Sequence, residues 1–156
     1  MNFFLSLHNL STRFDSILSE WGWAAGGLVV RVFVATQFFK AGLVKINDWD
    51  STLALFREEY TVPLLSPEIA AVLGAGGELL LPVLLTLGLF SRPAALGLFV
   101  VNAMAVLSYP QLLSFDCPAA INDHFYWGVL LLVVTLAGPG KVTLDAYLNR
   151  MHSRQA

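Results

Sequence analysis

Charged side chains are scarce in this chain of 156 residues. Lys, Arg, Asp and Glu together make up 13% of it, against roughly 25% in ordinary soluble domains. Hydrophobic residues make up 56%, and the mean hydropathy is +0.67. The net charge is -2 and no basic run occurs, which argues against nucleic acid as a partner. This composition predicts a single integral membrane domain surrounded by the lipid bilayer.

Cysteine and histidine are also too few for the common metal and thiol centres. Cys117 is the only cysteine, so an intramolecular disulfide and a Cys-x-x-Cys centre are both excluded. A mixed disulfide or persulfide with a partner stays open for this thiol, beside the simpler interpretation that it is incidental. The three histidines are scattered, and no two have the i, i+4 spacing that places ligands on one helix. We therefore expect neither a metal site nor a covalently held cofactor.

Four apolar stretches are long enough, or nearly long enough, to cross a membrane. A span needs about 20 residues, and the apolar run of the fourth stretch becomes long enough only if its helix begins near Pro118. The sequence therefore predicts an all-α membrane protein with four transmembrane helices. The expected spans cover residues 23–45, 67–90, 93–113 and 118–138.

Short amphipathic helices are expected outside these spans. Apolar residues recur at helical spacing from Phe3 to Leu18, which predicts a helix lying on the membrane surface. The segment after Asn47 predicts a second short helix that ends before Val62-Pro63, and 142–151 predicts a third. The start of the chain lacks the features of a removable signal peptide. Basic residues outside the spans favour cytoplasmic termini.

Two charges lie inside the apolar stretches. Arg31 falls in the first span and Glu78 in the second. An isolated ion at such depth costs at least a few kcal/mol, so we expect these opposite charges to meet inside the bundle. The pair could be a buried strut that fixes helix register. Alternatively, it lines a pocket for a polar headgroup or relays protons.

A second polar cluster is expected near the outer face. Lys45 follows Arg31 by about four helical turns and so projects from a similar face, whereas Lys40 points the other way. Asp123 and His124 begin the fourth span, and Asp48 and Trp49 follow the first. These groups could form a ligand site, or they could simply anchor the protein at the interface by snorkelling and through belt aromatics.

Two further features need an interpretation. Asn102 in the third span is positioned to hydrogen-bond across helices, which would stabilise the bundle, and it is also a candidate ligand-binding residue. Phe56, on the helix expected after the first span, could cap an outer pocket or meet a partner protein.

Several segments resemble the DoxX family of membrane proteins. The first is Phe39-Lys40-Ala41-Gly42-Leu43-Val44-Lys45, and the second is Glu78 followed by the turn at Arg92-Pro93-Ala94-Ala95. Three more segments are similar to a subgroup encoded beside enzymes that make copper-related modified peptides: Lys45-Ile46-Asn47-Asp48-Trp49, Glu59-Tyr60-Thr61-Val62-Pro63 and Ser108-Tyr109. The resemblance implies a four-helix protein of the bacterial inner membrane, with polar positions at Arg31, Lys45, Glu78 and Arg92. Lys40 departs from the small or uncharged residue expected before Ala41-Gly42.

The resemblance also adds a redox expectation, because some DoxX relatives are associated with quinone, thiol or metal-linked metabolism. One hypothesis is therefore a membrane subunit in which Arg31 and Glu78 shape a quinone pocket while Lys45 and His124 attract an anionic reductant. The other is a noncatalytic partner that holds a periplasmic or membrane protein through its outer loops. The candidate partner residues are Asp48, Trp49, Phe56, Cys117 and Asp123. A small-solute transporter is a third alternative, and it would require a homo-oligomer.

Overall fold

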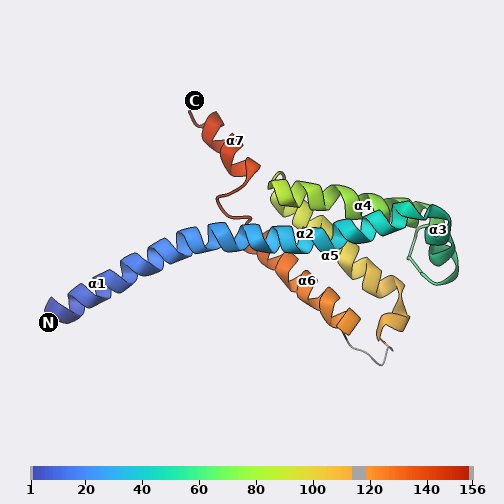
Figure 1. The fold of residues 1–156 in the computed structure, drawn as a ribbon, viewed down its shortest axis with the longest axis horizontal. Coiled ribbons are helices and arrows are strands. Elements are labelled where there is room, and N and C mark those ends of the chain that lie inside the picture. Colours follow the sequence, from blue (N-terminus) through green and yellow to red (C-terminus); the bar gives the residue numbers. More distant parts are fainter. Residues whose placement is uncertain (1, 114–118, 155–156) are drawn as a thin grey trace.

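The protein is a helical bundle in the computed structural model, which describes residues 2–113 and 119–154. Four helices within these ranges are long and apolar enough to cross a membrane. Figure 1 shows them running side by side, with shorter helices at both ends of the bundle. The long helices are α2 (Trp23–Asn47), α4 (Pro67–Leu87), α5 (Ser91–Ser108) and α6 (Ala119–Ala137). The prediction of an all-α, four-span membrane protein is therefore confirmed.

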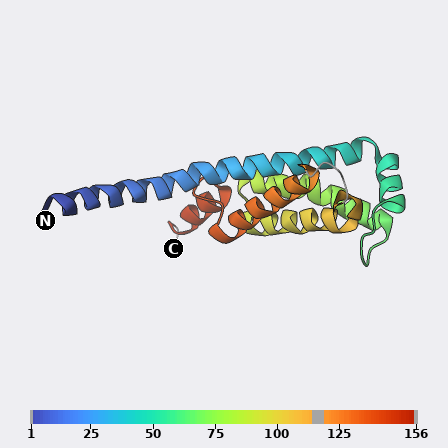
Figure 2. The same ribbon diagram turned by 90° about the horizontal axis from the view of Figure 1, so that it is seen from below.

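The shorter elements fill the positions expected for them, with one difference. They are α1 (Asn2–Ile17), a π-helical turn (Leu18–Gly22), α3 (Trp49–Glu58), a 3-10 turn (Pro110–Leu113) and α7 (Leu144–His152). The π-helical turn joins α1 to α2 without a break, so α1 continues the direction of α2 beyond the bundle (Figures 1 and 2). The predicted N-terminal helix is thus present. A helix lying on the membrane surface would have to turn away from α2, and α1 does not.

Local sequence explains where α4 begins and ends. The Ser66 hydroxyl accepts a hydrogen bond from the Ile69 amide, and Pro67 occupies the first turn, where its missing N–H is not needed. Gly88 ends the helix in the left-handed conformation, with φ of 71°. The second span therefore stops at Leu87 rather than at residue 90, and α5 begins at once with Ser91.

Small residues allow the long helices to approach closely. The core is built from α2, α4, α5 and α6, and three of its residues are alanines. Its buried residues are Val34, Ala35, Phe38, Leu85, Ala94, Ala95, Leu98, Leu131 and Val134. A Cβ added at Gly42 on α2 would lie 2.9 Å from the Leu79 side chain and 3.1 Å from the Glu78 backbone. Close packing at small residues is how helices associate in lipid, because the hydrophobic effect does not act between helices there.

The two ends of the bundle differ. At one end lie the start of α2, the turn between α4 and α5, and the segment leading to α7. At the other end lie α3 and the segment 59–66, which packs back on the end of α5 through a hydrogen bond from the Thr61 amide to the Ser108 carbonyl. We call this second end the α3 end.

Candidate functional site

The central feature of the α3 end is an ion pair between α2 and α4. Lys45 Nζ lies 2.6 Å from Glu78 Oε2 and 2.9 Å from Oε1, so the ammonium contacts both carboxylate oxygens. The two side chains are 18% and 9% exposed. The close approach of the helices at Gly42, one turn before Lys45, holds the backbones together at this level. The pair therefore lies in the wall of the bundle and neutralises two charges that would be costly alone.

The prediction that Arg31 pairs with Glu78 is wrong. Arg31 is fully buried, but its guanidinium lies at the opposite end of the bundle and donates to backbone carbonyls. Its acceptors include Leu85 at 3.2 Å and Val142 at 2.5 Å. The register explains the difference, because α2 is longer than α4 and places Arg31 beside the last turn of α4. Lys45, four turns further along the same face, is the cation that reaches Glu78.

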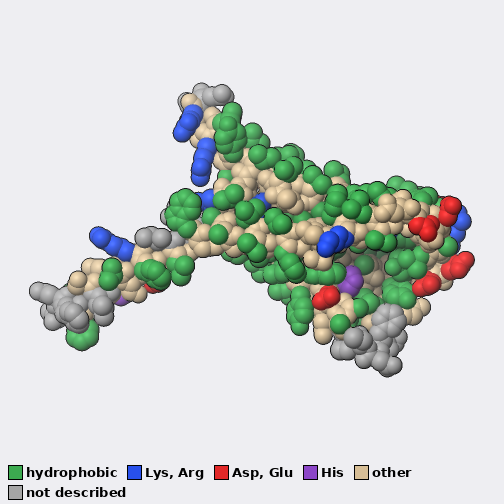
Figure 3. Space-filling view, viewed as in Figure 1, with side chains coloured by type: hydrophobic (Ala, Val, Ile, Leu, Met, Phe, Trp, Pro, Cys, Tyr) green, Lys and Arg blue, Asp and Glu red, His purple; other side chains and the backbone are tan. Residues whose placement is uncertain are grey.

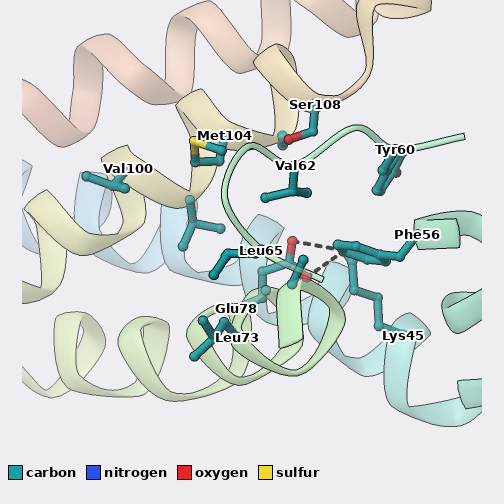
Figure 4. Close-up of a pocket in the computed structure, with 14 residues that line it drawn as sticks. Lys45, Phe56, Tyr60, Val62, Leu65, Leu73, Glu78, Val100, Met104 and Ser108 are labelled. Carbon is teal, nitrogen blue, oxygen red and sulfur yellow. Dashed lines mark hydrogen bonds and ion pairs between the residues drawn. The ribbon is translucent and has the colours of Figure 1, made fainter. Parts of the chain in front are cut away.

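Beside the ion pair lies a largely apolar cavity of about 230 Å³, which we call the lateral cavity. Figure 4 shows it between α4, α5 and the segment after α3. It is lined by Lys45, Phe56, Tyr60, Val62, Leu65, Ala70, Leu73, Gly74, Glu78, Val100, Val101, Met104, Ala105 and Ser108. Leu65, Leu73 and Val100 are each at least 40% exposed on the outer surface of the bundle. The mouth of the cavity is therefore at the surface that the spans present to lipid.

One polar atom in this cavity has no partner. Ser108 is 3% exposed, and its Oγ is the single buried side-chain nitrogen or oxygen among the described residues that makes no hydrogen bond. Most buried polar groups in proteins are satisfied, and an unsatisfied one costs about 1–3 kcal/mol. A ligand in the lateral cavity could supply the missing hydrogen bond.

Residues of α3 and of the segment 59–66 line the lateral cavity at the α3 end. Asp48 accepts from the Ser51 hydroxyl at 2.7 Å and caps α3 by accepting from the Ser51 amide at 3.0 Å, and these two bonds lower the pKa of Asp48. The Thr52 hydroxyl donates to the Lys45 carbonyl at 2.9 Å, which ties α3 to the ion-pair turn of α2. Phe56 then stacks edge-on against Tyr60. The short helix expected after the first span is therefore present, and its Phe56 lines the lateral cavity.

A second cavity, of about 340 Å³, lies on the other side of the ion pair. We call it the polar cavity. It shares Lys45, Tyr60, Glu78 and Ala105 with the lateral cavity. Its other lining residues are Gln37, Phe38, Ala41, Tyr109, Leu112, His124 and Trp127. Lys45 and His124, two members of the polar cluster expected from the sequence, therefore line the same cavity.

Asn102 holds His124 in a defined orientation. The Asn102 amide nitrogen donates to the His124 carbonyl at 2.8 Å, so its amide oxygen is the atom 2.8 Å from His124 Nδ1. An amide oxygen can only accept, and the neutral imidazole must therefore carry its proton on Nδ1. Nε2 is then the acceptor nitrogen of the ring. The expected interhelical role of Asn102 is confirmed, and it fixes the tautomer of a cavity residue as well.

Tyr60 stays a hydrogen-bond donor over the physiological pH range. Burial raises the pKa of its phenol, and the negative charge of Glu78 raises it further. Its ring also packs against Tyr109, with centroids 5.3 Å apart. A protonated phenol at the boundary of the two cavities can donate to a carbonyl or an anionic oxygen.

Of the other described residues considered from the sequence, Phe56 lines the lateral cavity, and Arg92, Trp49, Asp48 and Asp123 line neither cavity. Arg92 is at the opposite end, where its guanidinium lies 3.2 Å from the position that a Cβ at Gly138 would take. Trp49 packs against the core of α3 and α4, and Phe56 is only 6% exposed, so neither ring lies open on the surface. Asp48 and Asp123 are exposed. Cys117 lies outside the described residues.

Sequence reasoning from charge missed three lining residues: Tyr60, Ser108 and Tyr109. They lie in or beside irregular segments, where hydrophobic periodicity gives no signal. The available signal was the resemblance of Glu59-Tyr60-Thr61-Val62-Pro63 and Ser108-Tyr109 to one subgroup of a family, but it carried no role for these residues.

Four apolar spans, two of them joined by a largely buried ion pair, define a polytopic helical membrane protein. The sequence profile of the DoxX family matches residues 26–110, more than half of the chain, and the protein belongs to that family. It is also 28% identical over 128 residues to an uncharacterized protein of Haemophilus influenzae, an alignment that covers 80% of this chain and 84% of the relative. No solved structure matches.

Proposed function

We propose that the protein binds the headgroup of a membrane quinone in the lateral cavity and serves as a membrane subunit in quinone-linked redox metabolism. The observation that carries this proposal is the combination of a ring-sized apolar cavity with one buried hydroxyl, Ser108, that lacks a partner. A quinone has this pattern: an apolar ring with carbonyl oxygens that accept hydrogen bonds.

The size of the cavity supports a single ring. An engineered cavity of about 150 Å³ in another protein takes up benzene, so about 230 Å³ leaves room for one substituted ring. Lys45 and Glu78 neutralise each other, which favours a neutral occupant over an ion. Ser108 and the Tyr60 phenol can both donate to carbonyl oxygens.

The position of the mouth supports a ligand that enters from the bilayer. Leu73 and Val100 lie at the outer surface of two adjacent spans. An isoprenoid tail could leave the cavity between them and remain in the lipid. Our proposal places the protein in the bacterial inner membrane with the α3 end facing outward, because the basic residues outside the spans are concentrated at the other end.

The polar cavity fits the other requirement of this role, which is a place for the reductant. It places the His124 ring, with Nε2 as an acceptor, across the ion pair from the lateral cavity. A water-soluble reductant from thiol or metal-stress metabolism would approach His124 in the polar cavity. Electron transfer would depend on a partner, and this chain would bind and position the quinone.

Mass spectrometry of small molecules extracted from the gently purified protein tests the proposal. Two glycines on α4 provide matched variants. Gly74 lines the lateral cavity, whereas a side chain at Gly76 would meet nothing within 4 Å. We expect a near-stoichiometric quinone with wild type and Gly76→Leu, and at least a tenfold loss with Gly74→Leu. Bulk lipid alone in all three samples would contradict the proposal.

One observation favours the alternative of a noncatalytic partner protein. Leu64 is 104% exposed in the segment 59–66 and has φ of 67°, an unusual conformation for leucine. An exposed apolar side chain held in a strained backbone at the α3 end is a candidate docking point. Under this alternative, Leu64→Ser abolishes crosslinking to a membrane or periplasmic partner and leaves the copurified quinone unchanged.

A further inference from the structure

We propose that α7 is an interfacial anchor that lies in the headgroup layer of the bilayer and binds anionic phospholipids. This inference is independent of the quinone proposal, because it concerns the opposite end of the bundle. It rests on three features of α7: an unburied apolar face, basic residues beside that face, and a fixed attachment at the level where the spans end.

The apolar face of α7 has no partner within the described chain. Leu144, Tyr147, Leu148 and Met151 follow the i, i+3, i+4, i+7 spacing of one helical face. They are 40% to 60% exposed, and α7 contains no buried residue. Four large apolar side chains on a nine-residue helix are unusual for a segment that stands in water.

Basic side chains lie along one edge of this face. Arg150 is in the last turn of α7, and Arg154 follows one turn later, at about 40° from Arg150 on a helical projection. Figure 3 shows positive charge along one flank of the C-terminal helix and hydrophobic side chains along the other. Interfacial helices have this arrangement, with the apolar face in the acyl boundary and the cations among the phosphates.

The attachment of α7 sets its height relative to the membrane. The Asp145 carboxylate accepts from the Phe90 and Ser91 amides, each at 3.0 Å, in the turn between α4 and α5. The Asp145 amide donates to the Gly88 carbonyl at 3.0 Å. The first turn of α7 is therefore bound to the point where two spans end. Just before α7, the Val142 carbonyl accepts a hydrogen bond from the buried guanidinium of Arg31.

The fit at this attachment is tight enough to define the direction of α7. A Cβ at Gly88 would lie 2.6 Å from the Thr143 Cβ and 2.7 Å from Arg31 Nη1. Thr143 also caps α7 by accepting from the Ala146 amide at 3.0 Å. From this point α7 leaves the bundle at a steep angle to α2 (Figure 1). A helix that lies parallel to the membrane surface requires such an angle to the spans.

Depth measurements on nitroxide labels test the proposal in the full-length protein reconstituted in vesicles. In a Cys117→Ser background, Leu148→Cys places the label on the apolar face, and Asn149→Cys places it on the polar side as the matched control. In vesicles of phosphatidylcholine with phosphatidylglycerol, we expect the label at 148 to collide with oxygen and to be shielded from an aqueous nickel chelate. The label at 149 should show the reverse.

Charge dependence distinguishes a lipid surface from a protein contact. Arg150→Gln and Arg154→Gln should each lower the ratio of shielded to water-exposed label at 148 about fivefold, and pure phosphatidylcholine should do the same. Equal aqueous access at 148 and 149 in anionic vesicles would overturn the proposal. Shielding of 148 from both collision partners, whatever the lipid, would indicate protein contact and would overturn it as well.

Discussion

Lys45 and Glu78 form an ion pair whose two side chains line both cavities of the α3 end, with Nζ 2.6 Å from Oε2. The pair therefore connects three features of the α3 end: the packing of α2 on α4, the apolar lateral cavity and the polar cavity that holds His124. A substitution that alters one cavity should therefore also alter the other.

Breaking this pair should destabilise the bundle more than removing it. Glu78→Gln leaves the Lys45 ammonium without its counter-ion in a mostly buried place, and we expect a loss of about 3 kcal/mol in unfolding free energy. The double variant Lys45→Met with Glu78→Leu removes both charges and should recover most of that loss. Thermal unfolding in a mild detergent measures both. A double variant no more stable than Glu78→Gln would show that the pair is not the source of the stability.

The tautomer of His124 should depend on Asn102. In wild type, nitrogen NMR of labelled histidine should show the neutral ring protonated on Nδ1, because the Asn102 oxygen can only accept. Asn102→Ala should shift the ring toward protonation on Nε2 and cost about 1 kcal/mol of stability through the lost hydrogen bonds. The signals of His8 and His152, which lie on other helices, serve as internal controls. An unchanged tautomer in Asn102→Ala would contradict the geometry.

Two glycines of α2 should respond in opposite directions to alanine. At Gly42 a Cβ would meet Leu79 at 2.9 Å, so Gly42→Ala should separate α2 from α4 and cost about 1–3 kcal/mol. At Gly26 a Cβ would meet nothing within 4 Å, so Gly26→Ala should gain up to about 1 kcal/mol from helix propensity. Parallel melting curves give the comparison, and similar shifts for the two variants would argue against close packing at Gly42.

The attachment of α7 should survive at neutral pH and fail in acid. Partial burial opposes the charge of Asp145, but hydrogen bonds from Ser91 and Phe90 and the charge of Arg31 outweigh it and lower the pKa of this carboxyl. A lowered pKa means that the stabilisation is complete above the ordinary aspartate value and is lost as the pH falls through the lowered one. The amide shifts of Phe90 and Ser91 should therefore titrate only below about pH 4.

The control for this titration is Asp145→Asn, in which the two amide signals should not move with acid over the same range. A midpoint at or above the ordinary value of an aspartate in the wild-type protein would show that these hydrogen bonds do not stabilise the charged form.

The length of the apolar stretches predicted the spans, because the thickness of the bilayer sets this length and the sequence shows it directly. The helix after the first span was predictable for a similar reason, since Thr52 and Phe56 share one face and are both buried. The end of α4 was placed too late, because Gly88 ends the helix while Leu89 and Phe90 prolong the apolar run.

The pairing of charges could not be derived from the sequence. Arg31 and Lys45 lie on similar faces of α2, so either could have met Glu78, and the choice depends on how far α2 extends past α4. That offset is set by packing at Gly42 and by the turn at Gly88, which are contacts between distant segments. The partnerless hydroxyl of Ser108 is likewise a property of the assembled cavity and has no signature along the chain.

Photolabelling with an azido-benzoquinone tests the central claim most directly, because it reports where a quinone lies in the folded protein. In lipid nanodiscs we predict that labelled peptides come from α5 around Met104 and Ser108 and from the segment around Val62. Excess unlabelled quinone and Gly74→Leu should each reduce this labelling at least tenfold, while Gly76→Leu should not. Labelling spread evenly over the lipid-facing residues of all four spans, unaffected by Gly74→Leu, would contradict a quinone site in the lateral cavity.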